Sequence, residues 1–238
     1  MRNYLSFGGG VNSVALHLLM LDQGVEFESV FVHHGTDWPE TYHYVAMFQW
    51  WLKSQGHKPI TVLRPKKFHS LIDECEKYSI VPAQYPRWCT AKYKVEILYR
   101  YFKTPCFVNL GIDYGESKRA KISTESGIEN RWPLIEHEID RDGCKKIIES
   151  HGLPIPMKSG CYICPFQKKE QWVELRRKHP CLFRRAVDLE KANMEYRASK
   201  GKKPMFLSPS KKSLETIVDE NQTSMLEEDQ YPPCQCGL

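Results

Sequence analysis

The chain has 238 residues, 41% of them hydrophobic, and a formal net charge of +5. This length suits one domain of ordinary size, with or without a small C-terminal addition. No run of residues reaches the roughly 18 consecutive apolar positions that a membrane helix needs, so we expect no membrane partner. The chain begins without the pattern of a signal peptide, and we therefore expect a cytoplasmic protein.

Predicted strands alternate with predicted helices over the first 113 residues. Buried strands are predicted at 5–7, 29–33, 60–63 and 106–112. Helices are predicted at 12–23, 39–56, 68–77 and 92–102. This alternation predicts an α/β fold, a doubly wound parallel sheet that is covered by helices on both faces.

The pattern changes after about residue 113, where we expect no further strand. The elements predicted there are a polar loop at 113–126, a short helix at 140–150, a Pro- and Gly-rich loop at 152–160 and two basic helices at 168–178 and 181–199. From residue 201 onward the sequence is polar and irregular. We expect a helical, cysteine-bearing C-terminal part to follow the α/β core.

Charge supports a division into a core (1–139), a basic helical part (140–212) and an acidic tail (213–238). Residues 141–212 carry 18 Lys and Arg against 7 Asp and Glu, whereas residues 213–238 carry 6 acidic residues and no basic ones. The basic part suits a polyanion such as a nucleic acid, although two solvated basic helices would look the same. The acidic tail can lie on the basic part and compete with a polyanion.

The nine cysteines include two close pairs. Cys161 and Cys164 form a C-x-x-C, and Cys234 and Cys236 form a C-x-C. An odd number of cysteines argues against a fully paired disulfide framework. In a cytoplasmic protein such pairs are more typical of metal binding or redox chemistry.

A glycine run connects the first predicted strand to the first predicted helix. Residues 6–13 read S-F-G-G-G-V-N-S. Glycines let the backbone approach an anion closely, and the amides of the first helical turn, with Asn12 and Ser13, point at a phosphate. A structural turn would look alike, but the position after the first strand favours a phosphate site. No lysine follows, so this is not the G-x-x-x-x-G-K-[ST] loop.

The loop resembles the S-G-G-x-D-S loop of the PP-loop superfamily, whose members cleave or bind adenine nucleotides at the α-phosphate. Gly8 stands in place of the first serine, and Asn12 stands in place of the aspartate. The anion-binding glycines are kept. The resemblance implies a HUP-like fold and a site for ATP with Mg²⁺.

Further segments, in order between residue 4 and about residue 167, resemble the PAPS (phosphoadenylyl-sulfate) reductase family in its broad sense. That family includes the sulfate-assimilation reductases and the ATP pyrophosphatases of DNA phosphorothioation. The segments are H-G-T-D-W-P-E-T (34–41, resembling D-T-G…P-E-T), C-T-A-K-Y-K-V-E (89–96, resembling C-C-x-x-x-K-V-E), G-I-D-Y-G-E-S-K-R (111–119, resembling G-I-R…E-S-x-R), W-P-L-I (132–135), G-L-P (152–154) and G-C-Y-I-C-P (160–165).

The resemblance implies a set of nucleotide-binding residues. A guanidinium such as that of Arg119 suits a phosphate or sulfate oxygen, and Glu116 can orient it, although a plain surface ion pair is the alternative. His34 follows the second predicted strand, where ligands bind in open α/β sheets. The full set is Gly8, Gly9, Gly10, Ser13, His34, Glu116 and Arg119.

The cysteines imply a metal site. In iron–sulfur members of the family, a Cys-Cys pair and a C-x-x-C supply four thiolates to one cluster. Here Cys89 matches the first cysteine of the pair and Thr90 replaces the second, so Cys89, Cys161 and Cys164 remain as ligands. Cys144 or Cys181 would complete the set, or one iron would stay open. The cluster expected is [4Fe–4S]; zinc on the same thiolates, or no metal, are the alternatives.

The end of the sequence, C-Q-C-G-L, resembles the E-C-G-L-H tail of PAPS reductases, whose cysteine attacks the sulfate sulfur. Cys236 is therefore a candidate nucleophile. An accidental pair or a metal clip would also read as C-x-C.

Two activities follow from the resemblance. In the favoured one, ATP is bound by the loop, Asn12, Ser13 and Arg119 act at its phosphates, and an oxygen on a nucleic acid is adenylylated. Pyrophosphate leaves, and sulfur is inserted with the help of the cluster and of a donor protein such as a cysteine desulfurase. The alternative is a sulfonucleotide (PAPS or APS) reductase that forms sulfite through Cys236. A third possibility is a nucleotide-binding subunit that Asn12 has made inactive.

Overall fold

The structure is a computed structural model that describes residues 1–123 and 125–220. A parallel sheet of five strands, in the order β3-β2-β1-β4-β5, forms its centre. The strands are β1 (Arg2–Phe7), β2 (Glu28–Val32), β3 (Thr61–Leu63), β4 (Cys106–Leu110) and β5 (Ile128–Arg131). Successive strands run from β1 to one edge and then from β4 to the other. This confirms the predicted doubly wound α/β sheet.

β5 corrects the expectation that no strand follows residue 113. It pairs with β4 from Cys106↔Ile128 to Asn109↔Arg131. Its sequence, I-E-N-R, contains one apolar residue, and the strand lies at the edge of the sheet. A strand this short and polar carries too little of the alternating pattern for sequence reasoning to detect it.

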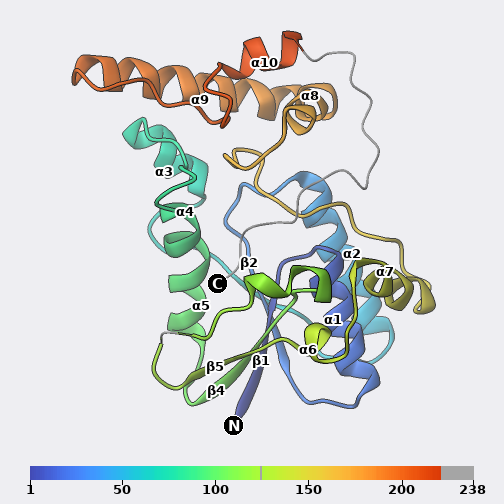
Figure 1. Ribbon diagram of the computed structural model, residues 1–238. Coiled ribbons are helices and arrows are strands. Elements are labelled where there is room, and N and C mark those ends of the chain that lie inside the picture. Colours follow the sequence, from blue (N-terminus) through green and yellow to red (C-terminus); the bar gives the residue numbers. More distant parts are fainter. Residues whose placement is uncertain (124, 221–238) are drawn as a thin grey trace.

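Helices cover both faces of the sheet (Figure 1). On one face lie α1 (Val11–Asp22), α2 (Pro39–Ser54) and α7 (Arg141–Ser150), with α6 (Pro133–Glu136) close by. Their apolar side chains share one core with Leu5, Phe7 and Phe31 of the sheet. On the other face, Leu98 and Phe102 pack against Tyr4, which alternates with Leu5 along β1. This alternation is the period of two that a strand imposes.

The helix predicted at 92–102 begins earlier and is irregular. It consists of α4 (Trp88–Thr90), a π-helical turn (Ala91–Val95) and α5 (Glu96–Tyr101). Turns of this kind are rare, and they occur frequently at functional sites. Here the turn directly follows Cys89 and Thr90.

The remaining helices form a layer at the end of the molecule away from the N-terminus (Figure 1). They are α8 (Lys169–Lys178), α9 (Pro180–Ser199) and α10 (Leu214–Glu220), and with α3 (Leu71–Tyr78) they share a third apolar core. α10 was not predicted, because residues 201 onward were expected to be irregular. Its side chains Leu214, Ile217 and Val218 are nevertheless buried.

The loop before α10 is fixed by one buried carboxylate. Glu190 of α9 is 1% exposed, and its two oxygens accept hydrogen bonds from Leu207 N and Leu214 N, both at 2.9 Å. Burial raises the pKa of this carboxyl, although the two amide donors favour its charged form. This clamp explains how a short helix in a polar segment becomes part of the core.

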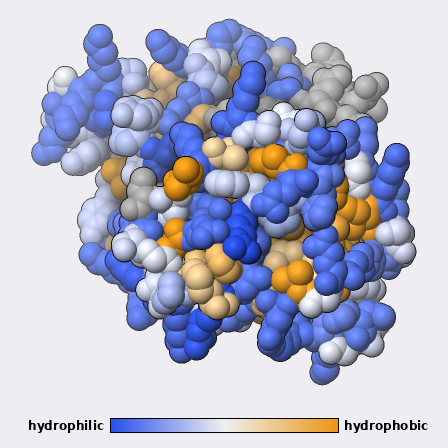
Figure 2. All heavy atoms as spheres, turned by 60° about the horizontal axis from the view of Figure 1, so that its bottom comes forward, coloured by the Kyte–Doolittle hydropathy of each residue, from blue (hydrophilic) through white to orange (hydrophobic). Residues whose placement is uncertain are grey.

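The face at the amino ends of the strands is largely hydrophilic, and hydrophobic residues appear on it in small separate groups (Figure 2). Among the described residues, none of the helices combines the length and the apolar character that crossing a membrane requires.

Candidate functional site

The order of the strands reverses between β1 and β4, and ligands of open α/β sheets bind at the carboxyl ends of the strands at such a point. β1 leads there into the glycine loop and α1, and β4 leads into Gly111. A Cβ atom on Gly111 would stand 2.9 Å from Ser13 N and 3.0 Å from Asn12 C. Glycine at this position therefore allows the end of β4 to lie directly against the first turn of α1.

The first turn of α1 is open to an anion. Its N-cap, Gly10, offers no side-chain cap, and the first turn contains no acidic residue. Helical hydrogen bonding begins with Val14 N donating to Gly10 O at 3.0 Å, so the amides before it have no acceptor within the helix. The Ser13 hydroxyl donates to the same carbonyl at 3.0 Å. Unsatisfied amides at the positive end of a helix are suited to bind phosphate.

The three loop glycines have different roles. Gly9 has a φ of +71°, and a Cβ atom on it would stand 2.9 Å from Val45 Cγ2 and 3.1 Å from Thr41 Cγ2 on α2. A Cβ atom on Gly10 would stand 2.6 Å from Ser159 Oγ. Only Gly8 leaves room for a ligand, since Ser13 Oγ at 3.8 Å is the sole described atom within 4 Å of its Cβ position. Packing thus requires glycine at positions 9 and 10, and the close approach of an anion to this loop stays a prediction.

Asn12 is part of a hydrogen-bonded chain. Its Nδ2 donates to Asp113 Oδ2 at 2.9 Å, and its Oδ1 accepts from Arg141 Nη1 at 2.9 Å. Asp113 is 4% exposed, and its Oδ1 accepts from Glu116 N at 3.1 Å. Sequence reasoning missed both partners. The sequence could have identified Asp113, because it occupies the arginine position of the G-I-R segment. Nothing in the sequence pattern indicated Arg141.

Glu116 and Arg119 are in direct contact, as an orienting pair should be. Both lie on a 3-10 helix (Tyr114–Arg119), and their carboxylate and guanidinium form an ion pair. Their side chains are only 14% and 26% exposed. Burial raises the pKa of the Glu116 carboxyl, while the Arg119 charge opposes this effect. The pair is partly buried, which distinguishes it from a plain surface ion pair.

His34 lines a pocket. It is 2% exposed, its Nδ1 is 2.6 Å from Thr36 Oγ1, and its Nε2 is 3.1 Å from Asp37 Oδ1. Burial alone would raise the pKa of Asp37, but the charges of His34 and Lys94 outweigh it and hold that pKa below its ordinary value. The structure therefore places His34 in a buried polar cluster, and its contact with a nucleotide stays a prediction.

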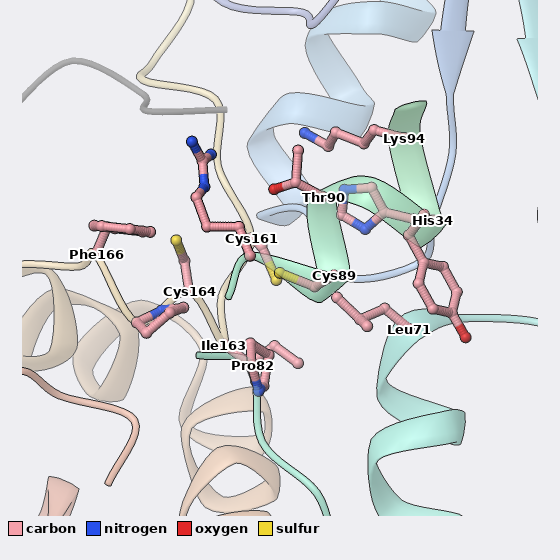
Figure 3. A pocket seen from close by; sticks show the side chains of 13 residues that line it. His34, Leu71, Pro82, Cys89, Thr90, Lys94, Cys161, Ile163, Cys164 and Phe166 are labelled. Carbon is pink, nitrogen blue, oxygen red and sulfur yellow. The ribbon is translucent and has the colours of Figure 1, made fainter. Parts of the chain in front are cut away.

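This pocket, here called the thiol pocket, is lined by Cys89, Cys161 and Cys164, together with His34, Arg87, Lys94 and Phe166 among others. Figure 3 shows the three cysteine side chains between Phe166 and His34. The two cysteines proposed to complete the set are elsewhere. Cys144 is buried in the core of α1 and α7, and Cys181 is exposed on α9. The buried Cys75 of α3 is instead the thiol near Cys89, because Cys89 adds to the effect of burial in raising its pKa.

The thiol pocket contains the types of side chain that a thiolate-bound anionic group would use. Burial, and then the nearby Cys164, raise the pKa of Cys161 well above its ordinary value, so the thiol is neutral without a bound cation. Arg87 Nε is buried and has no hydrogen-bond partner among the described residues, although its guanidinium lies 5.4 Å from the Phe166 ring centroid. A buried donor without an acceptor is costly, and an anionic group in the pocket would satisfy it. In the part of the chain that the structure describes, no three His, Cys, Asp or Glu side chains are grouped as a metal site, so the three cysteine ligands stay a prediction.

One segment joins the glycine loop to the thiol pocket. Ser159 lies against Gly10. Cys161 follows two residues later, so its Cα atom is within roughly 7 Å of the Cα atom of Ser159. Cys161 also forms an antiparallel bridge with Asp37. Trp38 N donates to Gly160 O at 2.9 Å, and Tyr162 N donates to Thr36 O at 2.8 Å. The glycine loop and the thiol pocket therefore belong to one composite site, which the P-E-T and C-x-x-C segments hold together.

The basic helices α8 and α9 carry ion pairs to the acidic helix α10. Arg176 pairs with Asp219 at 2.7 Å, and Lys191 pairs with Glu215 at 2.8 Å. The acidic segment thus lies on the basic part, as far as the described residues extend. Cys234 and the candidate nucleophile Cys236 lie outside the described residues.

Comparisons with known proteins identify the fold. No protein-family model and no curated protein matches the sequence. Among solved structures, a phosphoadenylyl-sulfate (PAPS) reductase from Candida auris, in complex with phosphate, matches with a TM-score of 0.50 and 18% identity, over 66% of this chain and 75% of that one. The U34-tRNA thiolase NcsA from Methanococcus maripaludis, with its [4Fe-4S] cluster, gives a TM-score of 0.43 and 10% identity, over 97% and 84% of the two chains.

Proposed function

We propose that this chain, which has the PP-loop type of fold found in a PAPS reductase, is a sulfur-transfer enzyme that binds an adenine nucleotide at the first turn of α1. The observation that carries this proposal is the connection between the glycine loop and the thiol pocket. Gly10 of the phosphate-binding loop lies against Ser159, and the C-x-x-C follows within two residues. A nucleotide-activated group bound at the loop would therefore be close to the thiols.

The favoured reaction begins with ATP. An oxygen on a nucleic-acid acceptor attacks the α-phosphorus, the new P–O bond forms, and the bond to pyrophosphate breaks. A sulfur nucleophile then bonds to the acceptor carbon, and AMP leaves with the original oxygen. The amides of the α1 first turn and Arg119 would bind the phosphates with Mg²⁺, while Ser13 and Asn12 maintain the shape of the turn.

Cys89, Cys161 and Cys164 are the residues that would hold a cluster, and such a cluster, when bound with one open iron, supplies a binding position for sulfide. Arg87 would direct its buried Nε–H towards the anionic group in the pocket. The alternative is a zinc ion bound by the same thiolates, which would have a structural role. A sulfur donor protein, such as a cysteine desulfurase, would deliver sulfur to this pocket.

Nucleic acid as the acceptor is supported by the charge of residues 141–212. Part of that charge is already paired. Arg177 and Lys178 pair with Glu174 within α8, and Arg176 and Lys191 pair with α10. A nucleic acid would have to compete with these exposed pairs, which are weak.

A sulfonucleotide reductase is the second candidate, supported by the likeness to a PAPS reductase and by the C-terminal Cys236. Its thiolate would attack the sulfate sulfur and expel the nucleotide phosphate, and a dithiol reductant would then release sulfite. An inactive nucleotide-binding subunit is the third candidate.

One experiment separates the three candidates. Anaerobically purified protein is incubated with ATP plus a nucleic-acid pool, or with PAPS plus a dithiol, and pyrophosphate and sulfite are measured. A variant that lacks residues 230–238 is tested in parallel; it keeps α10, whose Leu214, Ile217 and Val218 belong to the core. We expect pyrophosphate from ATP with both proteins. Sulfite that is lost on truncation would establish the reductase, and bound nucleotide without either product would establish the inactive subunit.

A further inference from the structure

The chain of hydrogen bonds from Asp113 through Asn12 to Arg141 ends beside the first turn of α1, directly after the glycine loop. We infer that Arg141 is a further phosphate-binding residue of this site and that Asn12 and Asp113 hold its guanidinium in place. The inference rests on the proposed nucleotide site at the first turn of α1. It assigns the ligand of Arg141 as the phosphate groups of the nucleotide.

Asp113 is the fixed end of the chain. It is 4% exposed, and both of its carboxylate oxygens accept hydrogen bonds, Oδ1 from Glu116 N and Oδ2 from Asn12 Nδ2. It also caps the 3-10 helix that carries Arg119. The position of this carboxylate is therefore determined by a backbone amide at one oxygen and by the Asn12 side chain at the other.

Asn12 connects Asp113 to Arg141 through hydrogen bonds at both ends of its amide. A carboxylate only accepts hydrogen bonds, so the amide nitrogen of Asn12 must face Asp113 and its oxygen must face away. That oxygen accepts from Arg141 Nη1 at 2.9 Å. An aspartate at position 12 would instead place two carboxylates side by side, which is unfavourable. Asn12 is thus matched to Asp113, and its orientation selects a donor on the other side.

Arg141 has donors left for a ligand. A guanidinium has five N–H groups in a fixed fork, and within residues 1–123 and 125–220 one of them is used, in the hydrogen bond to Asn12. Arg141 is exposed, and it begins α7, which packs against α1 through Cys144 and Ile148. Its contact, Asn12, lies in the same first turn as the unsatisfied amides. A phosphate bound there is within reach of a positive charge that the fold holds in place.

The first test is nucleotide binding, with a non-hydrolysable ATP analogue and with adenosine as probes. Arg141→Gln should weaken binding of the analogue about 10- to 100-fold, as expected for a charged hydrogen bond, and leave adenosine binding unchanged. Arg141→Lys should be intermediate, because it keeps the charge but loses the fork. The control with the same charge change is Arg2→Gln, at the amino end of β1 and away from the carboxyl ends of the strands. Thermal unfolding verifies that each variant is folded.

A second test exchanges the amide and the carboxylate. Asn12→Asp alone should lower the Tm and weaken binding of the analogue, since it faces the buried Asp113. The double variant Asn12→Asp/Asp113→Asn keeps the total charge and permits the same hydrogen bonds, so it should recover most of both losses. Additive losses in the double variant would overturn the proposed chain.

The outcomes separate the inference from the proposed function. Wild-type protein that does not bind the analogue would refute the nucleotide site and the inference with it. Wild-type protein that binds, with Arg141→Gln and Arg141→Lys binding equally well, would refute the role of Arg141 alone.

Discussion

Gly10 and Ser159 are in such close contact that a Cβ atom on Gly10 would stand 2.6 Å from Ser159 Oγ and 3.4 Å from Ser159 Cβ. They are far apart in sequence, and each belongs to a different half of the composite site. The contact therefore fixes the position of the glycine loop relative to the C-x-x-C segment.

Gly10→Ala should destabilise the protein by about 1–3 kcal/mol, as overpacking does, and should weaken binding of an ATP analogue. The φ of Gly10 is −101°, so alanine causes no backbone strain and the clash alone is tested. Ser159→Ala removes the oxygen, so the double variant Gly10→Ala/Ser159→Ala should recover stability in chemical denaturation. A double variant as unstable as Gly10→Ala would show that the contact with Ser159 is not the reason.

Metal content is the direct test of the thiol pocket. Anaerobically purified protein should be brown, and Cys161→Ser or Cys164→Ser should remove the colour by deleting a thiolate ligand. Cys181→Ser is the matched control, because Cys181 is exposed on α9 and should leave the colour unchanged. Iron, zinc and sulfide are measured in each protein. Colourless protein with one equivalent of zinc would assign the thiols a structural role.

The lowered pKa of His17 leads us to expect that the free energy of unfolding depends on pH. It is 3% exposed, lies 2.8 Å from Ser29 Oγ, and has its pKa lowered from 6.5 to about 3 by burial and then by His57. Below pH 6.5 the unfolded chain gains a proton at this residue that the folded chain does not. The free energy of unfolding should therefore fall by up to about 1.4 kcal/mol per pH unit as pH decreases from 6.5 towards 3.

The measurement is urea denaturation between pH 7.5 and pH 4.5. His17→Phe combined with Ser29→Ala keeps an aromatic ring in the core without an unpaired hydroxyl, and it should flatten the slope below pH 6.5. His43→Gln, at an exposed position of α2, serves as the control. An equal slope in wild type and in the double variant would contradict the role of His17.

The ion pairs of α10 predict how the basic part responds to nucleic acid. Asp219→Asn and Glu215→Gln release Arg176 and Lys191, and each should tighten binding of a single-stranded nucleic acid about 2- to 5-fold, the range of exposed ion pairs. Added salt should reduce the affinity of all variants. Glu96→Gln on α5 is the control for the lost charge. Unchanged affinity in both α10 variants would place the nucleic acid elsewhere.

Local patterns in the sequence were sufficient to predict the α/β fold. The alternation of strands and helices predicted four of the strands, and the helix predicted at 12–23 after the glycine run matches α1. Such signals depend on residues within one or two turns of each other, where periodicity and backbone propensity act. The edge strand β5 and the helix α10 were missed, because their stability comes from pairing and burial against distant segments.

The sequence by itself determined the parallel α/β architecture, the position of the glycine loop between the first strand and the first helix, and the candidate cysteines. Only the tertiary structure decided which of these residues meet. In the folded protein Arg141 contacts Asn12, His34 lines the thiol pocket, and Cys144 lies in the core of α1 and α7. The physical reason is that local sequence sets the backbone conformation of an element, whereas side-chain partners across more than 100 residues depend on how whole elements pack.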